Sequence, residues 1–141
     1  MTGLIRGRKC TRGQSLVEFA LVLPLLVLVV LGTFDFGRAI FAFNSVSNAA
    51  RTAARVAIVD QTPNAIELAA RDEAVALDSI AVSVTYTNGA TTCSPVVIGC
   101  VATVRVQHTY SPATPLIGNI VGSTTLSSTA KMPVERAYSS P

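Results

Sequence analysis

The chain has 141 residues, of which half are hydrophobic, only 13% are charged and none is Trp. This length supports one domain of ordinary size, and the low charge content is unusual for a soluble domain. The net charge of +3 does not predict nucleic-acid binding, because four basic residues are gathered ahead of an apolar run and no aromatic stacking residues accompany them. These four residues are Arg6, Arg8, Lys9 and Arg12.

An apolar run without any charge covers residues 19–34, shortly after the basic cluster. With residues 16–18 it approaches the roughly 20 residues that a transmembrane helix needs. Pro24 lies inside the run, and a helix in lipid tolerates it because the backbone there has no alternative to helix. Basic residues before a span stay in the cytoplasm, so we expect the rest of the chain to lie outside. A removable signal peptide is less suitable, since residues 35–38 replace a small-residue cleavage site.

The helix is expected to continue beyond the membrane. A continuous helix over residues 15–59 would be about 67 Å long, whereas the hydrocarbon core is only about 30 Å thick. Five alanines recur there at three- and four-residue spacing and form one narrow face. They are Ala49, Ala50, Ala53, Ala54 and Ala57. This face predicts packing against another element, either the chain's own sheet or a neighbouring subunit.

The remaining residues predict a small α+β unit. Pro63 is well placed to start a second, amphipathic helix that extends to residue 77. Apolar and polar residues alternate over residues 80–87, 102–110 and 125–132, which predicts three strands. The segment "SPATPLIGNIVGS" at 111–123 contains two Pro and two Gly and is expected to be a loop. The predicted fold is α+β: a long N-terminal transmembrane helix that extends out of the membrane, a short second helix and an antiparallel sheet of about three strands.

Two cysteines lie in the part that we expect outside the membrane. An oxidising compartment favours a disulfide between Cys93 and Cys100, which would close a small loop and add about 2–3 kcal/mol of stability. Two buried free thiols are the alternative. Cys10 lies on the expected cytoplasmic side of the membrane, where the sequence offers no second cysteine to pair with it.

The sequence contains no motif of nucleophilic, phosphate-binding or zinc-dependent catalysis. His108 is the only histidine, and no acid or nucleophile lies near it in the sequence, so a structural role fits it better than that of a general base. The acids at 72, 73 and 78 lack the spacing of a cation-binding loop. We therefore expect no enzyme activity, no cofactor, no metal and no small-molecule substrate.

Glu18 is a carboxylate at the start of the apolar segment. An ionised group inside the bilayer costs roughly 2.5–3.5 kcal/mol on insertion scales. One interpretation places Glu18 at the level of the lipid headgroups. The other gives the carboxylate a function, because Gly13 precedes it by five residues, and a cut after Gly13 would make Glu18 the fifth residue of a chain that begins at Gln14.

A basic leader that ends in glycine, four uncharged residues, a glutamate and an apolar helix resemble a type IV prepilin. The sequence resembles in particular the TadE-like pseudopilins of tight-adherence (Tad) pilus systems. The resemblance is carried by "GQSLVEFALVLP" at 13–24, "FDFGR" at 34–38 and "NAARTAAR" at 48–55. Within these stretches the motif positions are Gly13, Glu18, Phe19, Pro24, Asp35, Gly37 and Arg38. The strong part covers roughly residues 13–59, a third of the chain.

The resemblance implies that a prepilin peptidase cuts after Gly13 at the cytoplasmic face of the membrane. The resemblance also divides the chain into a leader (1–13), a transmembrane and extended helix (14–60) and an extracytoplasmic α+β domain (61–141). The protein would cross the bacterial cytoplasmic membrane once, with its N-terminus inside. Many prepilins have Phe after the cut where this chain has Gln14, so N-methylation does not follow from the resemblance.

Cleavage would give Glu18 a partner, namely the new ammonium group of Gln14 on a neighbouring subunit. At about 4 Å and an effective dielectric constant near 20, their attraction is on the order of 4 kcal/mol before desolvation. This is comparable with the insertion penalty. The predicted function is therefore a minor pseudopilin that assembles through its apolar helix with other pilins and the assembly platform of a Tad-type pilus or a related envelope secretion machine. The sizeable outer domain favours a minor component over the main pilin.

Two other functions remain open at this stage. The first is an uncleaved, single-span protein whose outer domain binds a ligand or a surface. The second is a secreted hydrolytic or redox domain that uses Cys93 and Cys100 as reactive thiols.

Past the span, Asp35 and Arg38 are three residues apart and predict an intrahelical ion pair or a contact between subunits. Gly32 and Gly37 would either permit close approach of another helix or only loosen the helix where it leaves the span.

Overall fold

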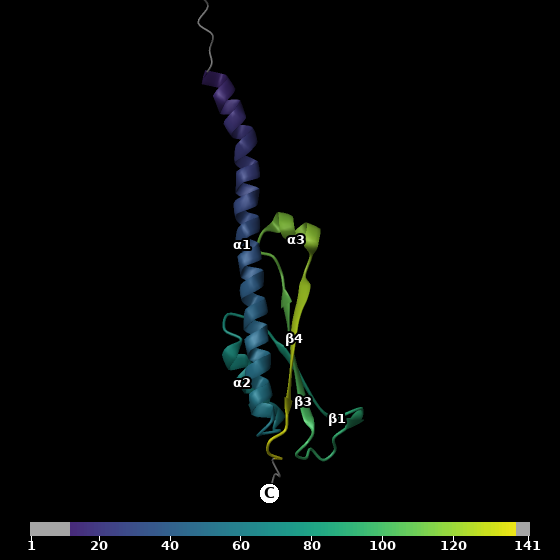
Figure 1. Cartoon of the computed structure of the whole chain (residues 1–141). Helices are drawn as coiled ribbons and strands as arrows, with labels where there is room; N and C mark the ends of the chain where they lie inside the picture. The colour runs from purple at the N-terminus through teal and green to yellow at the C-terminus, as the bar shows by residue number, and fades with distance from the viewer. Residues whose placement is uncertain (1–11, 138–141) are drawn as a thin grey trace, which may run out of the picture.

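The computed structural model describes residues 12–137 (Figure 1). The predicted leader positions Arg6, Arg8, Lys9 and Cys10 lie outside the described residues. Helix α1 (Arg12–Ala57) has 46 residues and is therefore about 69 Å long. This confirms the predicted long helix, with ends that differ by two or three residues from the expected ones.

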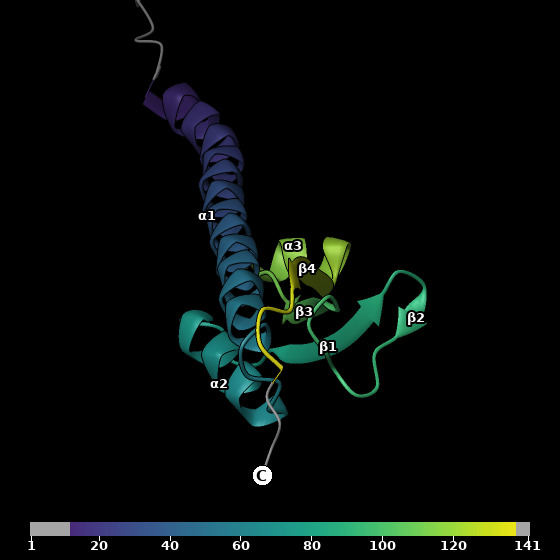
Figure 2. The ribbon, with the colours of Figure 1, turned by 60° about the horizontal axis from the view of Figure 1, so that its bottom comes forward.

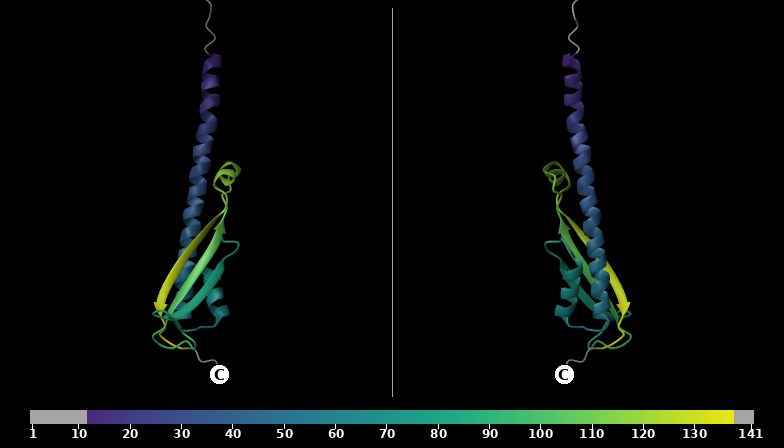
Figure 3. Two further views of the ribbon diagram at one scale, coloured as in Figure 1. Left: turned by 90° about the vertical axis from the view of Figure 1, so that its right-hand side faces the viewer. Right: turned by 90° about the vertical axis from the view of Figure 1, so that its left-hand side faces the viewer.

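The N-terminal half of α1 stands clear of the rest of the protein (Figures 1 and 3). Within residues 12–137, α1 is the one helix that is long and apolar enough to cross a membrane. No part of its most apolar stretch is buried. The helix continues through Pro24, although proline lacks the N–H that would donate to the carbonyl four residues earlier. A fully exposed apolar helix of this length is unstable in water and requires lipid or other helices around it.

The part of the chain after α1, called the outer domain after its expected location, is α+β, as predicted. It contains α2 (Pro63–Glu73), β1 (Ala81–Asn88), β2 (Thr91–Thr92), β3 (Val101–Tyr110), α3 (Pro115–Val121) and β4 (Thr124–Pro133). The strands form one antiparallel sheet in the order β2-β1-β3-β4 (Figure 2). The three predicted strands are confirmed to within a residue. The two-residue strand β2 was not predicted, and it pairs with β1 after the turn at Gly89, whose φ is +60°.

The prediction of a loop over residues 111–123 is wrong for residues 115–121, which form α3. Pro115 stands at the first turn of this helix, where a missing N–H removes no hydrogen bond. Gly122, with φ of +70°, ends the helix. Two of the four Pro and Gly residues that suggested a loop, Pro115 and Gly122, are thus the start and stop signals of a short helix. Helix α2, by contrast, ends at Glu73 rather than at residue 77.

The core lies between the sheet, α2 and the C-terminal half of α1. All five alanines of the predicted narrow face are completely buried, and they belong to one cluster with β3 side chains such as Val104 and Val106. Ile66 and Ala70 of α2 complete this cluster. The alanine face therefore packs on the chain's own sheet, and small side chains allow the helix axis to approach the strands closely.

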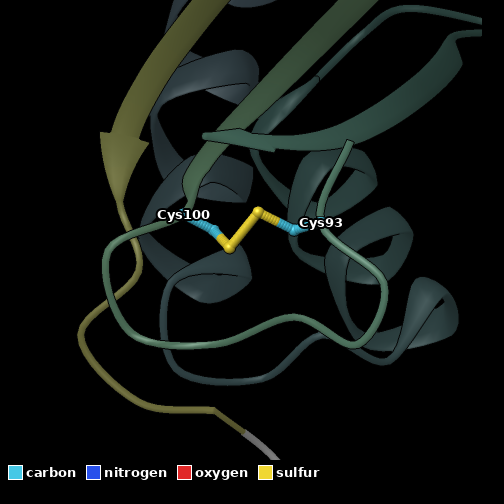
Figure 4. Close-up of a disulfide and its surroundings, with 2 residues drawn as sticks. All are labelled: Cys93 and Cys100. Carbon is cyan, nitrogen blue, oxygen red and sulfur yellow. A yellow bond between two sulfur atoms is a disulfide. The ribbon is translucent and has the colours of Figure 1, made fainter. Parts of the chain in front are cut away.

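The end of the domain farthest from the N-terminus is tied together covalently and by hydrogen bonds. Cys93 and Cys100 form a disulfide (Figure 4), as predicted, and it links the segment after β2 to the start of β3. The backbone N–H groups of Glu135 and Arg136 donate to the carbonyl of Ile58 at 3.1 and 3.0 Å. These bonds hold the chain after β4 against the C-terminal end of α1.

Asp60 closes the connection between α1 and α2. Its Oδ1 accepts a hydrogen bond from the backbone N–H of Thr62 at 2.8 Å. Hydrogen bonds from the Thr62 side chain and backbone hold the pKa of Asp60 below its ordinary value. Burial raises the pKa of the nearby Tyr86, and the Asp60 charge adds to this effect. The Tyr86 hydroxyl stays protonated and lies 3.4 Å from the carbonyl of Ala57.

A larger side chain in the alanine face should destabilise the outer domain. Ala53→Leu inserts three carbons between α1 and β3, and overpacking of this kind costs about 1–3 kcal/mol. Asn48→Leu is the matched control, because Asn48 lies on the same helix and is exposed. Urea unfolding in detergent, followed by circular dichroism, should show a lower midpoint for Ala53→Leu only. Equal midpoints for the two variants would mean that the face is not tightly packed.

Candidate functional site

The predicted processing site lies at the start of α1. Gly13 and Gln14 are both exposed residues of the helix. A Cβ atom built on Gly13 would meet nothing within 4 Å. The fold of the described residues therefore does not require glycine at position 13, and a larger residue there would leave the protein's own structure unchanged.

Glu18 is exposed on the first part of α1, among apolar side chains. Leu16, Val17 and Phe19 around it are also exposed. No ion pair or hydrogen bond joins the Glu18 carboxylate to another residue within 12–137. Gln14 lies one helical turn before Glu18 on the same helix. A carboxylate in apolar surroundings with no partner in its own folded chain must be solvated by headgroups or matched by a charge from outside the chain.

A second carboxylate, Asp35, lies directly after the apolar run and has a different environment. Only 5% of the surface of Asp35 is exposed to solvent. The backbone N–H of Ala113 donates to Oδ1 and that of Thr114 donates to Oδ2, both at 3.1 Å. The Tyr110 hydroxyl donates to the Asp35 backbone carbonyl at 2.8 Å. Asp35 thus connects α1 to the end of β3 and to the segment that leads into α3.

The half-exposed side chain of Arg38 also contacts this junction. Its guanidinium is 3.9 Å from Asp35 Oδ1 and lies 6.0 Å from the centre of the Tyr110 ring. The predicted intrahelical pair is therefore present, but it is long and half-exposed, so it contributes little compared with the two N–H groups. The stronger contacts of Asp35 were missed because they join residues 78 and 79 positions apart, and no local pattern reports them.

The helix surface around the junction is open. Phe34 and Phe36, on either side of Asp35, are exposed. A Cβ atom on Gly37 would meet nothing within 4 Å. The glycine at this position therefore leaves free surface on α1 rather than room for a neighbouring part of the described chain. This surface is accessible to a helix of another subunit, and that role remains a prediction.

His108 has a structural contact. Its Nδ1 lies 2.7 Å from the carbonyl oxygen of Ser79, and because a carbonyl only accepts, Nδ1 carries the proton and donates. Over residues 12–137, no group of three or more His, Cys, Asp or Glu side chains is arranged to hold a metal ion. The chemistry of the site therefore lies in the two carboxylates of α1 and their different surroundings.

Residues 13–55 match the protein family described as TadE-like protein. The resemblance predicted from Gly13, Glu18 and the residues that follow them is confirmed over this stretch. The match starts at the predicted cleavage site and ends two residues before the end of α1, so it covers the helix and none of the sheet. No curated protein and no solved structure matches the chain. The TadE-like character is therefore a property of the N-terminal helix, about 30% of the chain.

Removal of the Asp35 carboxylate should loosen the segment before α3. In Asp35→Ala the N–H groups of Ala113 and Thr114 lose a charged acceptor, and their hydrogen exchange should accelerate by about tenfold or more. Asp72→Ala, which removes an exposed acid from α2, should leave the exchange rates of these two amides unchanged. Mass-spectrometric hydrogen exchange on the full chain in detergent would measure both. Unchanged protection in Asp35→Ala would show that the segment is held by other contacts.

Proposed function

We propose that this protein is a minor pseudopilin of a Tad-type pilus or a related envelope secretion machine. In this function a prepilin peptidase removes residues 1–13, and the mature protein assembles through the exposed half of α1. The single observation that carries the proposal is Glu18. Its carboxylate has no partner among residues 12–137 and lies on an apolar, exposed helix, five residues after Gly13, inside a segment that matches the TadE-like family.

The division of α1 into two halves supports an assembly role. Its C-terminal half is already occupied by the chain's own sheet and α2. Its N-terminal half carries a continuous set of exposed apolar side chains from Leu16 to Leu31. Such a surface is stable only in lipid or in contact with similar helices. One helix thus serves as a membrane anchor before assembly and as a packing element afterwards, while the outer domain stays folded on the same helix.

The positions of Gly13, Gln14 and Glu18 on α1 support the proposed pairing of Glu18 with the terminus of a neighbour. Cleavage after Gly13 creates an ammonium group on Gln14, and both groups lie near the N-terminal end of α1. Within one helix the ammonium is one turn from the carboxylate. Between two subunits that are displaced along the helix axis, the charges meet only at one displacement. In other registers both charges are left unpaired in apolar surroundings, so the pair also selects the register.

The first test concerns processing at Gly13. In cells that express a prepilin peptidase, intact-mass analysis should show a chain that lacks thirteen N-terminal residues. Gly13→Leu should block this shortening, because a side chain before the scissile bond obstructs the protease, while the fold is undisturbed because position 13 is open. Gly7→Leu, also in the leader, should be cut normally. A full-length wild-type product alongside an active peptidase would favour an uncleaved, membrane-anchored binding protein instead.

The second test concerns the charge of Glu18. Glu18→Gln keeps the size of the side chain and removes the charge, so cleavage should persist. The amount incorporated into sheared pilus fractions should fall by about tenfold, which corresponds to a loss of about 1.4 kcal/mol of net pairing. Glu73→Gln, which removes an acid from α2, should be incorporated like the wild type. Normal incorporation of the Glu18→Gln protein would disprove charge pairing and leave the processing proposal standing.

A further inference from the structure

Helix α3 carries the most exposed large apolar side chain among the described side chains of the outer domain. Ile120 is 79% exposed and the adjacent Val121 is 61% exposed. Ile120 exceeds even Leu21 of the apolar helix, which is 74% exposed. Single exposed apolar residues are common on soluble proteins and need no explanation. What distinguishes these two residues from the other exposed apolar residues of the domain is their location.

Helix α3 is held at the point where α1 leaves the apolar run. The two residues directly before it, Ala113 and Thr114, donate their N–H groups to the Asp35 carboxylate. Asp35 follows the last residue of the uncharged stretch 19–34. From this anchor α3 projects past the end of the sheet, toward the N-terminal half of α1 (Figures 1 and 3). It is therefore the part of the outer domain that lies nearest to the apolar segment.

The stretch of sequence that contains α3 is uncharged. No Asp, Glu, Lys or Arg occurs between Arg105 and Lys131, although ten such residues occur elsewhere between residues 58 and 137. An uncharged element next to a membrane span can enter the interface between headgroups and acyl chains without desolvating a charge. Helix α3 is also anchored at Asp35, the residue that directly follows the uncharged stretch of α1.

We propose that α3 is a second membrane contact of this protein, which lies in the outer leaflet and seats the outer domain on the bilayer. The inference rests on the proposed function only in that α1 spans the membrane. The lipid covers Ile120 and Val121, while the Asp35 hydrogen bonds fix the depth of α3 relative to the span. The contact restricts rotation and tilt of the domain about α1 and so orients its other surfaces before assembly. Extraction into a pilus would uncover α3 for a neighbouring subunit.

The absence of Trp from the chain allows a direct test with single-tryptophan variants. The full-length protein is reconstituted at low protein-to-lipid ratio into phosphatidylcholine vesicles that are brominated near the headgroup in both leaflets. The fluorescence of Ile120→Trp should be quenched about twofold or more, since interfacial helices are buried roughly 5–10 Å. Ile98→Trp is the matched control. Ile98 is 72% exposed and lies in the loop between the disulfide cysteines, at the other end of the domain, so its fluorescence should not be quenched.

Leu26→Trp, in the middle of the apolar helix, reports on the span itself. Quenching of this variant by lipids brominated deep in the acyl chains, together with unquenched Ile120→Trp, would overturn the role of α3 and leave the proposed function intact. Unquenched Leu26→Trp would overturn the membrane span and the α3 contact with it. A blue-shifted but unquenched Ile120→Trp would mean that a second copy of the chain covers α3, and would also overturn the lipid contact.

Discussion

The close packing of the alanine face of α1 on the sheet is the constraint on which the rest of the structure depends. The buried residues of this helix form one stripe, which extends from Ala57 back through Ala49 and Ala42 to Asp35. Their spacing of seven or eight, which is made up of steps of three and four, keeps them on one side of the helix. Small side chains bring the strands near the helix, and this proximity allows Tyr110 at the end of β3 to reach the backbone of Asp35. The outer domain therefore ends where the stripe ends.

The two carboxylates of α1 show how one chain handles charge in apolar surroundings in two ways. Asp35 is buried, and the folded domain supplies its partners: two backbone N–H groups and, at longer range, Arg38. Glu18 is exposed in an apolar stretch and receives no partner from residues 12–137. A buried charge is stable only when it is paired or hydrogen-bonded. The charge of Asp35 thus has its partners within one copy of the chain. The charge of Glu18 needs a partner from outside residues 12–137.

Periodicity alone was sufficient to predict the elements that repeat a local pattern. The long helix, the second helix and the three longer strands follow from spacing in the sequence, and the alanine face follows from its three- and four-residue recurrence. Local patterns could not show whether that face packs on its own sheet, because a small-residue face suits any close partner. They also could not reveal the contacts of Asp35 with Ala113 and Thr114, which depend on the course of the whole sheet. Helix α3 was missed because its Pro and Gly boundaries are also typical of loops.

The family resemblance was easier to predict than the contacts of the domain, for a related reason. Gly13, Glu18 and Pro24 belong to a signature confined to one helix, where sequence distance and spatial distance are proportional. The outer domain has no such signature, and the family match stops at residue 55. Its particular features, including the Asp35 junction and the exposed α3, come from tertiary contacts. The family match therefore covers the part of the chain that is proposed to be inserted and assembled, and none of the sheet.

The spacing of the two carboxylates connects the membrane state with the assembled state. Glu18 and Asp35 are 17 residues apart, or about 26 Å along a helix, which is close to the roughly 30 Å of hydrocarbon in a bilayer. In the membrane both groups can therefore lie at opposite interfaces, and Glu18 can be solvated by headgroups and water. A subunit that leaves the bilayer for a helical bundle loses that solvation. In the proposed assembly, the carboxylate needs the ammonium of a neighbour only at this step, where the pair would select the register.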